Sequence, residues 1–351
     1  MRSKSALFFL YLFSIFFFAC DDEDPENYLV IHVTEDITQP TTWETGTIYI
    51  IEAFDLWVTA TLTIQPGVIV KFTATGAFLS VGPGGSIHAH GTNDQPIIFT
   101  SDCDDQNGGD TNSDDDQSIP APGYWAKIVI EEDGSVFKFC MFQYGGGFEA
   151  VSTLELYGAD AMVTNCTFRY NMGGYFGHYR GALDASSAKP ETVIRDNYFY
   201  RNHIPLSISS EISMDNSNLF QNPEESSEIN TMNGIFVYDY DNINGNVSWV
   251  ETDVPFVIND GDLWLGATGV LILGDDVILK FTSYSWLNIS ETGEFNFNSS
   301  NIFTSFPDDS YLGDTNGDGT STVPGPDYWG GIYFDGPGTY LNGANILYNT
   351  Y

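Results

Sequence analysis

The sequence predicts an all-β solenoid, a fold in which short strands stack coil upon coil along one axis. Three observations support this prediction: a long stretch of sequence occurs twice, a shorter motif recurs within its first copy, and helical periodicity is nearly absent from the chain. Repeats of this kind are typical of folds whose single units cannot bury an apolar face and therefore stack on their neighbours.

The long repeat aligns residues 99–125 with residues 303–329 without a gap, at an offset of 204 residues. Both stretches are acidic and end in Tyr-Trp, a pair that either stacks on sugars or holds its own loop against the coil beneath. Upstream, Val70–Lys71–Phe72 matches Leu279–Lys280–Phe281.

These alignments predict two solenoid segments with long acidic loops inserted between coils. The first copy is expected at residues 43–248. The second is expected at residues 249–351 and would lack about a hundred residues of the first.

A finer repeat places an apolar residue, a small or polar residue, a second apolar residue and a Gly or Asn at fixed spacing. We expect the final Gly or Asn to occupy a corner between strands that needs a positive φ angle. The repeat occurs at Phe137-Cys140-Phe142-Gly145, Val163-Cys166-Phe168-Asn171, Ile194-Asn197-Phe199-Asn202, Met214-Ser217-Leu219-Asn222 and Leu341-Ala344-Ile346-Asn349.

Cys140 and Cys166 hold the same phase of this repeat, so their side chains should stack on neighbouring coils. A spacing of about 4.8 Å between coils permits a disulfide. The alternative is an internal ladder of small side chains, which Asn197 and Ser217 favour because they occupy the same position without needing a partner.

This pattern resembles the right-handed parallel β-helix superfamily, which includes pectate lyases and many bacterial surface proteins. The resemblance covers nearly all of residues 43–351 and implies a fold more than a function. An all-β sandwich is the second interpretation of the short strands. The calcium ligands and catalytic arginine of pectate lyases have no clear match, and Asp184, Asp196 and Asp215 are the nearest substitutes.

The N-terminus is predicted to be an export signal. Arg2 and Lys4 precede an apolar run at residues 6–19 that is too short to span a membrane. Cys20 follows it and resembles the lipidated cysteine of a bacterial lipobox, although Phe17 departs from that pattern. Ordinary cleavage and a retained anchor are the alternatives.

Four acidic residues, 21–24, directly follow the cysteine. They resemble the export signal of surface lipoproteins of the Bacteroidota, and a solvated tether is the plainer interpretation. We therefore predict a signal peptide at residues 1–19, an acidic tether at residues 20–42, and a lipid-anchored protein exposed on the outer membrane.

The formal net charge is −37. A chain this acidic repels nucleic acid and anionic membrane surfaces, so neither is an expected partner. The 42 % of hydrophobic residues is ample for a packed core, and disorder is therefore not expected.

The acidic loops contain candidate calcium ligands. Carboxylate and amide oxygens at alternate positions converge on one point when a turn follows them. Neither loop has the later bidentate Glu of an EF-hand, and a solvated acidic turn is the alternative. The candidates are Asp314, Asn316 and Asp318 before Gly319, and Asp110, Asn112 and Asp114 before Asp115.

A basic cluster lies in the middle of the first copy. It holds every arginine after the signal, together with two tyrosines, and is predicted to bind an anionic polysaccharide through paired hydrogen bonds and ring stacking. An equally supported alternative is that these arginines form ion pairs within the chain. The residues are Arg169, Arg180, Arg195, Arg201, Tyr175 and Tyr179.

Two functions from different classes remain. The first is a non-catalytic surface protein, a calcium-stabilised spacer that binds a glycan or serves adhesion. The second is a calcium-dependent polysaccharide lyase or glycoside hydrolase that acts on an anionic polysaccharide.

Overall fold

The computed structural model describes residues 28–351 except 74–75, 116, 148–151, 175–178, 241 and 260. Within this part of the chain there are thirty strands and no helix, and hence no helix that could span a membrane. The predicted lipidation site Cys20 and the predicted ligand-binding Tyr175 lie outside the described residues.

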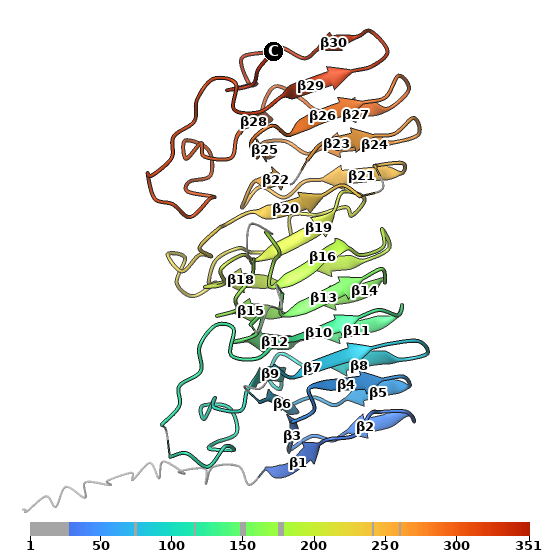
Figure 1. Ribbon diagram of the computed structural model, residues 1–351, viewed down its shortest axis with the longest axis vertical. Coiled ribbons are helices and arrows are strands. Elements are labelled where there is room, and N and C mark those ends of the chain that lie inside the picture. The colour runs from blue at the N-terminus through green and yellow to red at the C-terminus, as the bar shows by residue number, and fades with distance from the viewer. Residues whose placement is uncertain are drawn as a thin grey trace, which may run out of the picture.

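The strands form five sheets that run along the molecule (Figure 1). A seven-stranded sheet contains β1 (Leu29–Val33), β3 (Thr47–Ile51), β6 (Ile69–Phe72), β9 (Ile97–Ser101), β12 (Cys140–Gln143), β15 (Thr167–Arg169) and β18 (Tyr198–Tyr200). A ten-stranded sheet contains β4 (Asp55–Val58), β7 (Phe78–Val81), β10 (Lys127–Ile130), β13 (Leu154–Tyr157), β16 (Leu183–Ser187), β19 (Leu206–Ser209), β20 (Ile235–Tyr238), β22 (Phe256–Ile258), β25 (Ile278–Phe281) and β28 (Ile302–Ser305).

A six-stranded sheet contains β2 (Thr41–Trp43), β5 (Thr61–Ile64), β8 (Ser86–His90), β11 (Ser135–Lys138), β14 (Ala161–Thr164) and β17 (Val193–Arg195). The two smaller sheets lie in the C-terminal part of the chain, from residue 246 onward. They contain β21 (Asn246–Trp249), β24 (Val270–Leu273) and β27 (Glu294–Asn296), and β23 (Leu263–Leu265), β26 (Trp286–Ile289), β29 (Gly331–Phe334) and β30 (Thr339–Tyr340).

Most strands pair in parallel with the strand three positions later in the chain, so one coil contributes one strand to each of three sheets. β29 and β30 pair antiparallel. This arrangement confirms the predicted parallel β-helix. The solenoid begins earlier than predicted, because β1, which lies inside the range assigned to the acidic tether, pairs with β3. The predicted boundary followed the extent of the family resemblance, which was placed at residues 43–351 and which β1 precedes.

The core of the seven-stranded sheet is a stack of phenylalanine rings, which confirms the aromatic position of the finer repeat. Successive ring centroids are 4.8, 4.7, 5.1 and 5.3 Å apart. The rings belong to Phe99, Phe142, Phe168, Phe199 and Phe220. The predicted fourth copy is therefore wrong by one residue: Tyr198 pairs with Leu219, which places Phe220 in the stack in place of Leu219.

Cys140 and Cys166 are buried and free, as the ladder interpretation requires. Asn197 continues their row, because its Oδ1 accepts a hydrogen bond from the backbone nitrogen of Cys166 at 2.9 Å. The next member is Asn218, whose Oδ1 accepts from the backbone nitrogen and Nδ2 of Asn197. The predicted member Ser217 is displaced by the same one-residue shift.

The corners after β12, β15 and β18 of the seven-stranded sheet also differ from prediction. The left-handed residue is the one before the expected Gly or Asn: Tyr144 (φ 64°), Tyr170 (φ 55°) and Arg201 (φ 53°). The asparagines serve a different purpose, since their side-chain amides hydrogen-bond from coil to coil.

The two acidic loops (first acidic loop, residues 102–124; second acidic loop, residues 306–328) project from the same side of the solenoid (Figure 1). The first follows β9 of the seven-stranded sheet and the second follows β28 of the ten-stranded sheet. Each loop ends at a buried tryptophan: Trp125 stacks on Phe72 at 4.1 Å, and Trp329 stacks on Phe281 at 3.9 Å. These tryptophans hold their own loops against the core.

Candidate metal centres and polar sites

The first acidic loop is fastened by a buried lysine. Lys71 points outward from β6, but the loop covers it completely. Its Nζ donates to the backbone oxygens of Asp104 and Gly109 at 3.0 and 2.9 Å, and to Oγ1 of Thr111 at 2.9 Å. Burial lowers the pKa of Lys71, and the negative charge of Asp104 opposes that shift.

The second acidic loop repeats this arrangement. Lys280 in β25 is fully buried, and its Nζ donates to the backbone oxygen of Gly313 at 3.0 Å and to Oγ1 of Thr315 at 2.7 Å. Burial lowers the pKa of Lys280 to about 8, against the opposing charge of Asp308. The sequence repeat aligned the two lysines, but outward strand positions are usually solvated, so their role was not predicted.

A carboxylate at the base of each loop is also buried. Asp104 Oδ2 accepts hydrogen bonds from Thr100 Oγ1 and Gln143 Nε2, both at 2.6 Å. In the second loop, Thr304 Oγ1 donates to Asp308 Oδ2 at 2.6 Å. Both carboxylates are 1 % exposed.

The predicted calcium ligands adopt the same turn in both loops. Asp110 accepts from the backbone nitrogens of Asp114 and Asp115, as Asp314 accepts from those of Asp318 and Gly319. Asp115 and Gly319 are both left-handed, with φ of 54° and 73°. The missing glycine therefore does not change the turn, because aspartate tolerates this conformation better than most residues.

The amide side chains in these turns leave one oxygen uncovered. Asn112 Nδ2 donates to Asp114 Oδ2, and Asn316 Nδ2 donates to Asp318 Oδ2. The Oδ1 atoms of both asparagines are buried and have no hydrogen-bond partner among the described residues. An orphaned buried acceptor is costly unless a cation or water covers it.

One group of carboxylates in the first loop lies close enough together to hold a metal ion. Oxygen atoms of Asp105, Asp110 and Asp114 lie within 4.8 Å of one another. In the second loop, Asp309 matches Asp105, and burial followed by the charge of Asp314 raises the pKa of the Asp309 carboxyl. The sequence motif predicted Asp110 and Asp114 as ligands, whereas Asp105 lies outside that motif.

The four arginines of the predicted ligand face lie on three sides of the solenoid. Arg169 ends β15 and Arg201 follows β18, both in the seven-stranded sheet. Arg195 ends β17 of the six-stranded sheet, and Arg180 precedes β16 of the ten-stranded sheet. The expectation that these arginines form one basic cluster is therefore corrected. Residues close in sequence reach different faces because each coil turns through three sheets.

Each arginine also has a partner within the chain. Arg195 Nε lies 2.8 Å from Asp215 Oδ2, Arg201 pairs with Glu228, and Arg169 Nε donates to Gln143 Oε1 at 2.9 Å. Of the two predicted tyrosines, Tyr179 is described, and it stacks on Phe236 at 5.3 Å in a second apolar cluster outside the main core. These contacts match the internal alternative.

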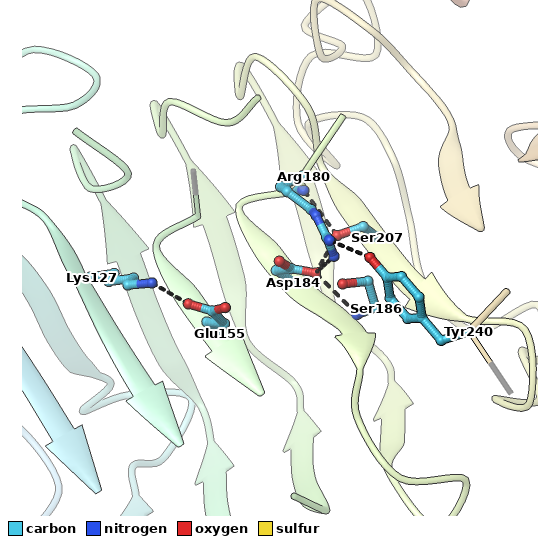
Figure 2. A network of polar contacts seen from close by, with 8 residues as sticks. Lys127, Glu155, Arg180, Asp184, Ser186, Ser207 and Tyr240 are labelled. Atoms are coloured by element: carbon cyan, nitrogen blue, oxygen red, sulfur yellow. Dashed lines mark hydrogen bonds and ion pairs between the residues drawn. The ribbon is translucent and has the colours of Figure 1, made fainter. Parts of the chain in front are cut away.

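Arg180 belongs to a polar network on the outer face of the ten-stranded sheet (Figure 2). Its guanidinium lies 3.3 Å from Asp184 Oδ1, donates to Tyr240 Oη at 2.6 Å and stands 4.1 Å above the ring of Tyr238. Asp184 Oδ1 also accepts from Ser207 Oγ at 2.7 Å.

A second ion pair extends this network along the solenoid. Glu155 pairs in register with Asp184 on the neighbouring strand, and Lys127 forms an ion pair with Glu155. The strand pairing shifts just after these residues, forming a bulge that contains Ser186. Two adjacent carboxylates between two cations are a feature that sequence spacing did not reveal.

Comparison with known proteins agrees with the fold. Residues 35–112 match the family of pectate-lyase like beta helix domains. With the stacked parallel sheets, this match decides the architecture. The chain is a parallel β-helix protein. The comparisons found no matching curated protein and no matching solved structure.

Proposed function

We propose that this parallel β-helix protein is a non-catalytic, lipid-anchored protein of the bacterial outer surface. Its solenoid is a rigid spacer, its acidic loops bind calcium, and one of its faces binds a glycan or serves adhesion. The observation that carries the proposal is the acidic loop, which is built twice with the same buried lysine and the same turn of Asp and Asn oxygens.

Charge balance within the first loop supports a bound cation. Lys71 is the lysine that the loop encloses, and the described part of the loop contains six aspartates. Without a further cation this excess costs self-repulsion. The aspartates are Asp102, Asp104, Asp105, Asp110, Asp114 and Asp115.

The donor set suits calcium better than a transition metal. Calcium prefers carboxylate and amide oxygens in flexible geometry, whereas zinc and copper prefer nitrogen or sulfur. Asp105, Asp110 and Asp114 would supply carboxylates, and the uncovered Oδ1 of Asn112 would supply a neutral oxygen.

Calcium is expected to raise the melting temperature of the protein relative to chelator. A cation that binds only the folded state stabilises it by RT ln(1 + [L]/Kd), about 1 kcal/mol per site at a fivefold excess over Kd. Because extracellular calcium sites often have Kd values of about 10⁻⁴ to 10⁻³ M, millimolar calcium should suffice. Asp314→Asn with Asp318→Asn should remove part of the rise.

The matched control is Asp275→Asn with Asp276→Asn, which makes the same charge change in the turn before β25, away from the acidic loops. The control should keep the full calcium-dependent rise. Equal melting temperatures in chelator and calcium would mean that the loops are solvated acidic turns held by lysine alone.

The lipid anchor is a proposal from the N-terminal sequence, supported by the apolar run before Cys20 and the acids after it. The wild type should label with palmitate and partition into detergent, while Cys20→Ser should do neither. Equal labelling of both proteins would contradict the lipoprotein interpretation.

A polysaccharide lyase or glycoside hydrolase is the second candidate function. The observation in its favour is the register pair Glu155 and Asp184, flanked by Lys127 and Arg180. Assays with uronate polymers in calcium, followed at 235 nm for unsaturated product and by reducing ends for hydrolysis, separate the two functions. Product that disappears in Asp184→Asn would establish the enzyme.

A further inference from the structure

The outer face of the seven-stranded sheet carries a groove that none of the predicted sites includes. Two cavities of about 390 and 360 Å³ lie along this face and share Pro96 as a lining residue. Their floor is a row of side chains in register on successive strands. These are Ile69, Ile98, Met141, Thr167 and Tyr198.

The wall of this axial groove comes from the corners that precede the strands of the sheet. Phe139, Asn165 and Asp196 occupy equivalent corners on three successive coils, and all are left-handed, with φ of 49°, 53° and 57°. This conformation is unfavourable for a phenylalanine. Each of these residues lines the second cavity. The wall therefore repeats along the axis at the spacing of the coils, about 4.8 Å.

A longer connection forms the middle of the wall. Most corners before this sheet are short, with a single residue between β11 and β12, whereas residues 91–96 separate β8 from β9. This connection supplies Asn93 to one cavity and Asp94 and Gln95 to the other.

The charges of the groove exclude an anionic ligand. Neither cavity is lined by a lysine, arginine or histidine among the described residues, while Asp94 and Asp196 contribute carboxylates. A uronate or sulfated polymer would meet repulsion here, on a chain of net charge −37. Most polar lining groups are uncharged amides and hydroxyls, which suit a ligand rich in neutral hydroxyl groups. They are Thr45, Thr92, Asn93, Gln95, Asn165, Thr167 and Ser217.

One aromatic side chain on the floor of the groove is exposed to solvent. Tyr198 is 39 % exposed and follows Thr167 and Met141 in the row of the floor. An exposed tyrosine beside hydrogen-bonding side chains offers an apolar face and a polar tip. A sugar ring has the complementary surfaces, with C–H groups on its faces and hydroxyls at its edge.

We propose that the axial groove binds a neutral oligosaccharide chain that lies along the solenoid axis, with a sugar ring stacked on Tyr198. Successive coils would meet successive sugars, because the coil spacing is comparable with the length of one pyranose unit. This inference rests on the glycan-binding part of the proposed function and names its site and ligand class. It does not depend on calcium.

The test is isothermal titration of the full chain with the hexaoses of cellulose, xylan, mannan and amylose, and with polygalacturonate. We expect binding of at least one neutral hexaose, in chelator as well as in calcium, with little change between low and high salt. Tyr198→Ala should weaken that binding about tenfold, the order of one aromatic contact. Asn165→Ala should weaken it as well, through loss of hydrogen bonds.

Tyr157→Ala is the matched control, because Tyr157 is an exposed tyrosine at the end of β13 on another sheet. It should bind like the wild type. The proposal is overturned if the folded wild type binds none of the four hexaoses or binds only polygalacturonate. It is also overturned if Tyr198→Ala binds the hexaoses as tightly as the wild type does. The calcium-dependent melting temperature, measured on the same samples, shows separately whether the calcium proposal holds.

Discussion

Lys71→Met is expected to lower the free energy of unfolding by about 2–4 kcal/mol and to release the first acidic loop from the seven-stranded sheet. The substitution leaves the backbone oxygens of Asp104 and Gly109 buried without their donor and removes a positive charge from among aspartates. The cost of burying the ammonium, visible as the lowered pKa of Lys71, offsets part of this loss. Urea unfolding and limited proteolysis within residues 102–124 measure the two effects.

Lys280→Met should act in the same way on the second acidic loop. Lys189→Met is the control, because Lys189 forms an exposed ion pair with Asp133, and such pairs contribute at most about 1 kcal/mol. If both buried lysines can be replaced without a change in unfolding or in protease sensitivity, the loops are held by their tryptophans and not by the lysines.

The sequence predicted the fold well because successive coils of a solenoid repeat the same pattern of residues. The aromatic position of the finer repeat corresponds to a real stack, from Phe99 through Phe168 and beyond. The error in the fourth copy has a local cause. Both Leu219 and Phe220 are apolar, and the pairing of Tyr198 with Leu219, which decides between them, is a contact between coils that spacing alone does not reveal.

The candidate sites were less predictable, because they depend on which side of a coil a residue occupies. Arg180 and Arg195 are close in the sequence, yet they lie beside the ten-stranded and six-stranded sheets. In the same way, the axial groove joins Pro96, Asn165 and Asp196, which come from three coils. Sequence motifs find candidate ligands that are adjacent in the chain, such as Asp110 and Asp114, but not residues that meet across coils.

The asparagines of the finer repeat recur as predicted, but their structural role differs from the predicted one. Asn171 and Asn202 were expected to provide positive φ, but Tyr170 and Arg201 take that conformation. Asn202 instead links three coils. Its Oδ1 accepts from the backbone nitrogen and Nδ2 of Asn171 on the preceding coil at 3.1 and 3.0 Å, and its Nδ2 donates to the backbone oxygen of Phe168 at 2.8 Å. Its Nδ2 also donates to Oδ1 of Asn230 on the following coil at 2.9 Å.

Asn202→Ala is therefore expected to destabilise the protein by about 3–5 kcal/mol, because it leaves several buried polar groups on the neighbouring coils without partners, each costing about 1–3 kcal/mol. Asn202 is 1 % exposed, so water does not reach these groups in the folded chain. Urea unfolding followed by circular dichroism measures the loss. Asn246→Ala, at an exposed position in β21, serves as the control and should change stability by about 0.5 kcal/mol or less. Similar unfolding midpoints for the two variants would show that the hydrogen bonds between asparagine side chains add no stability to that of the backbone pairing.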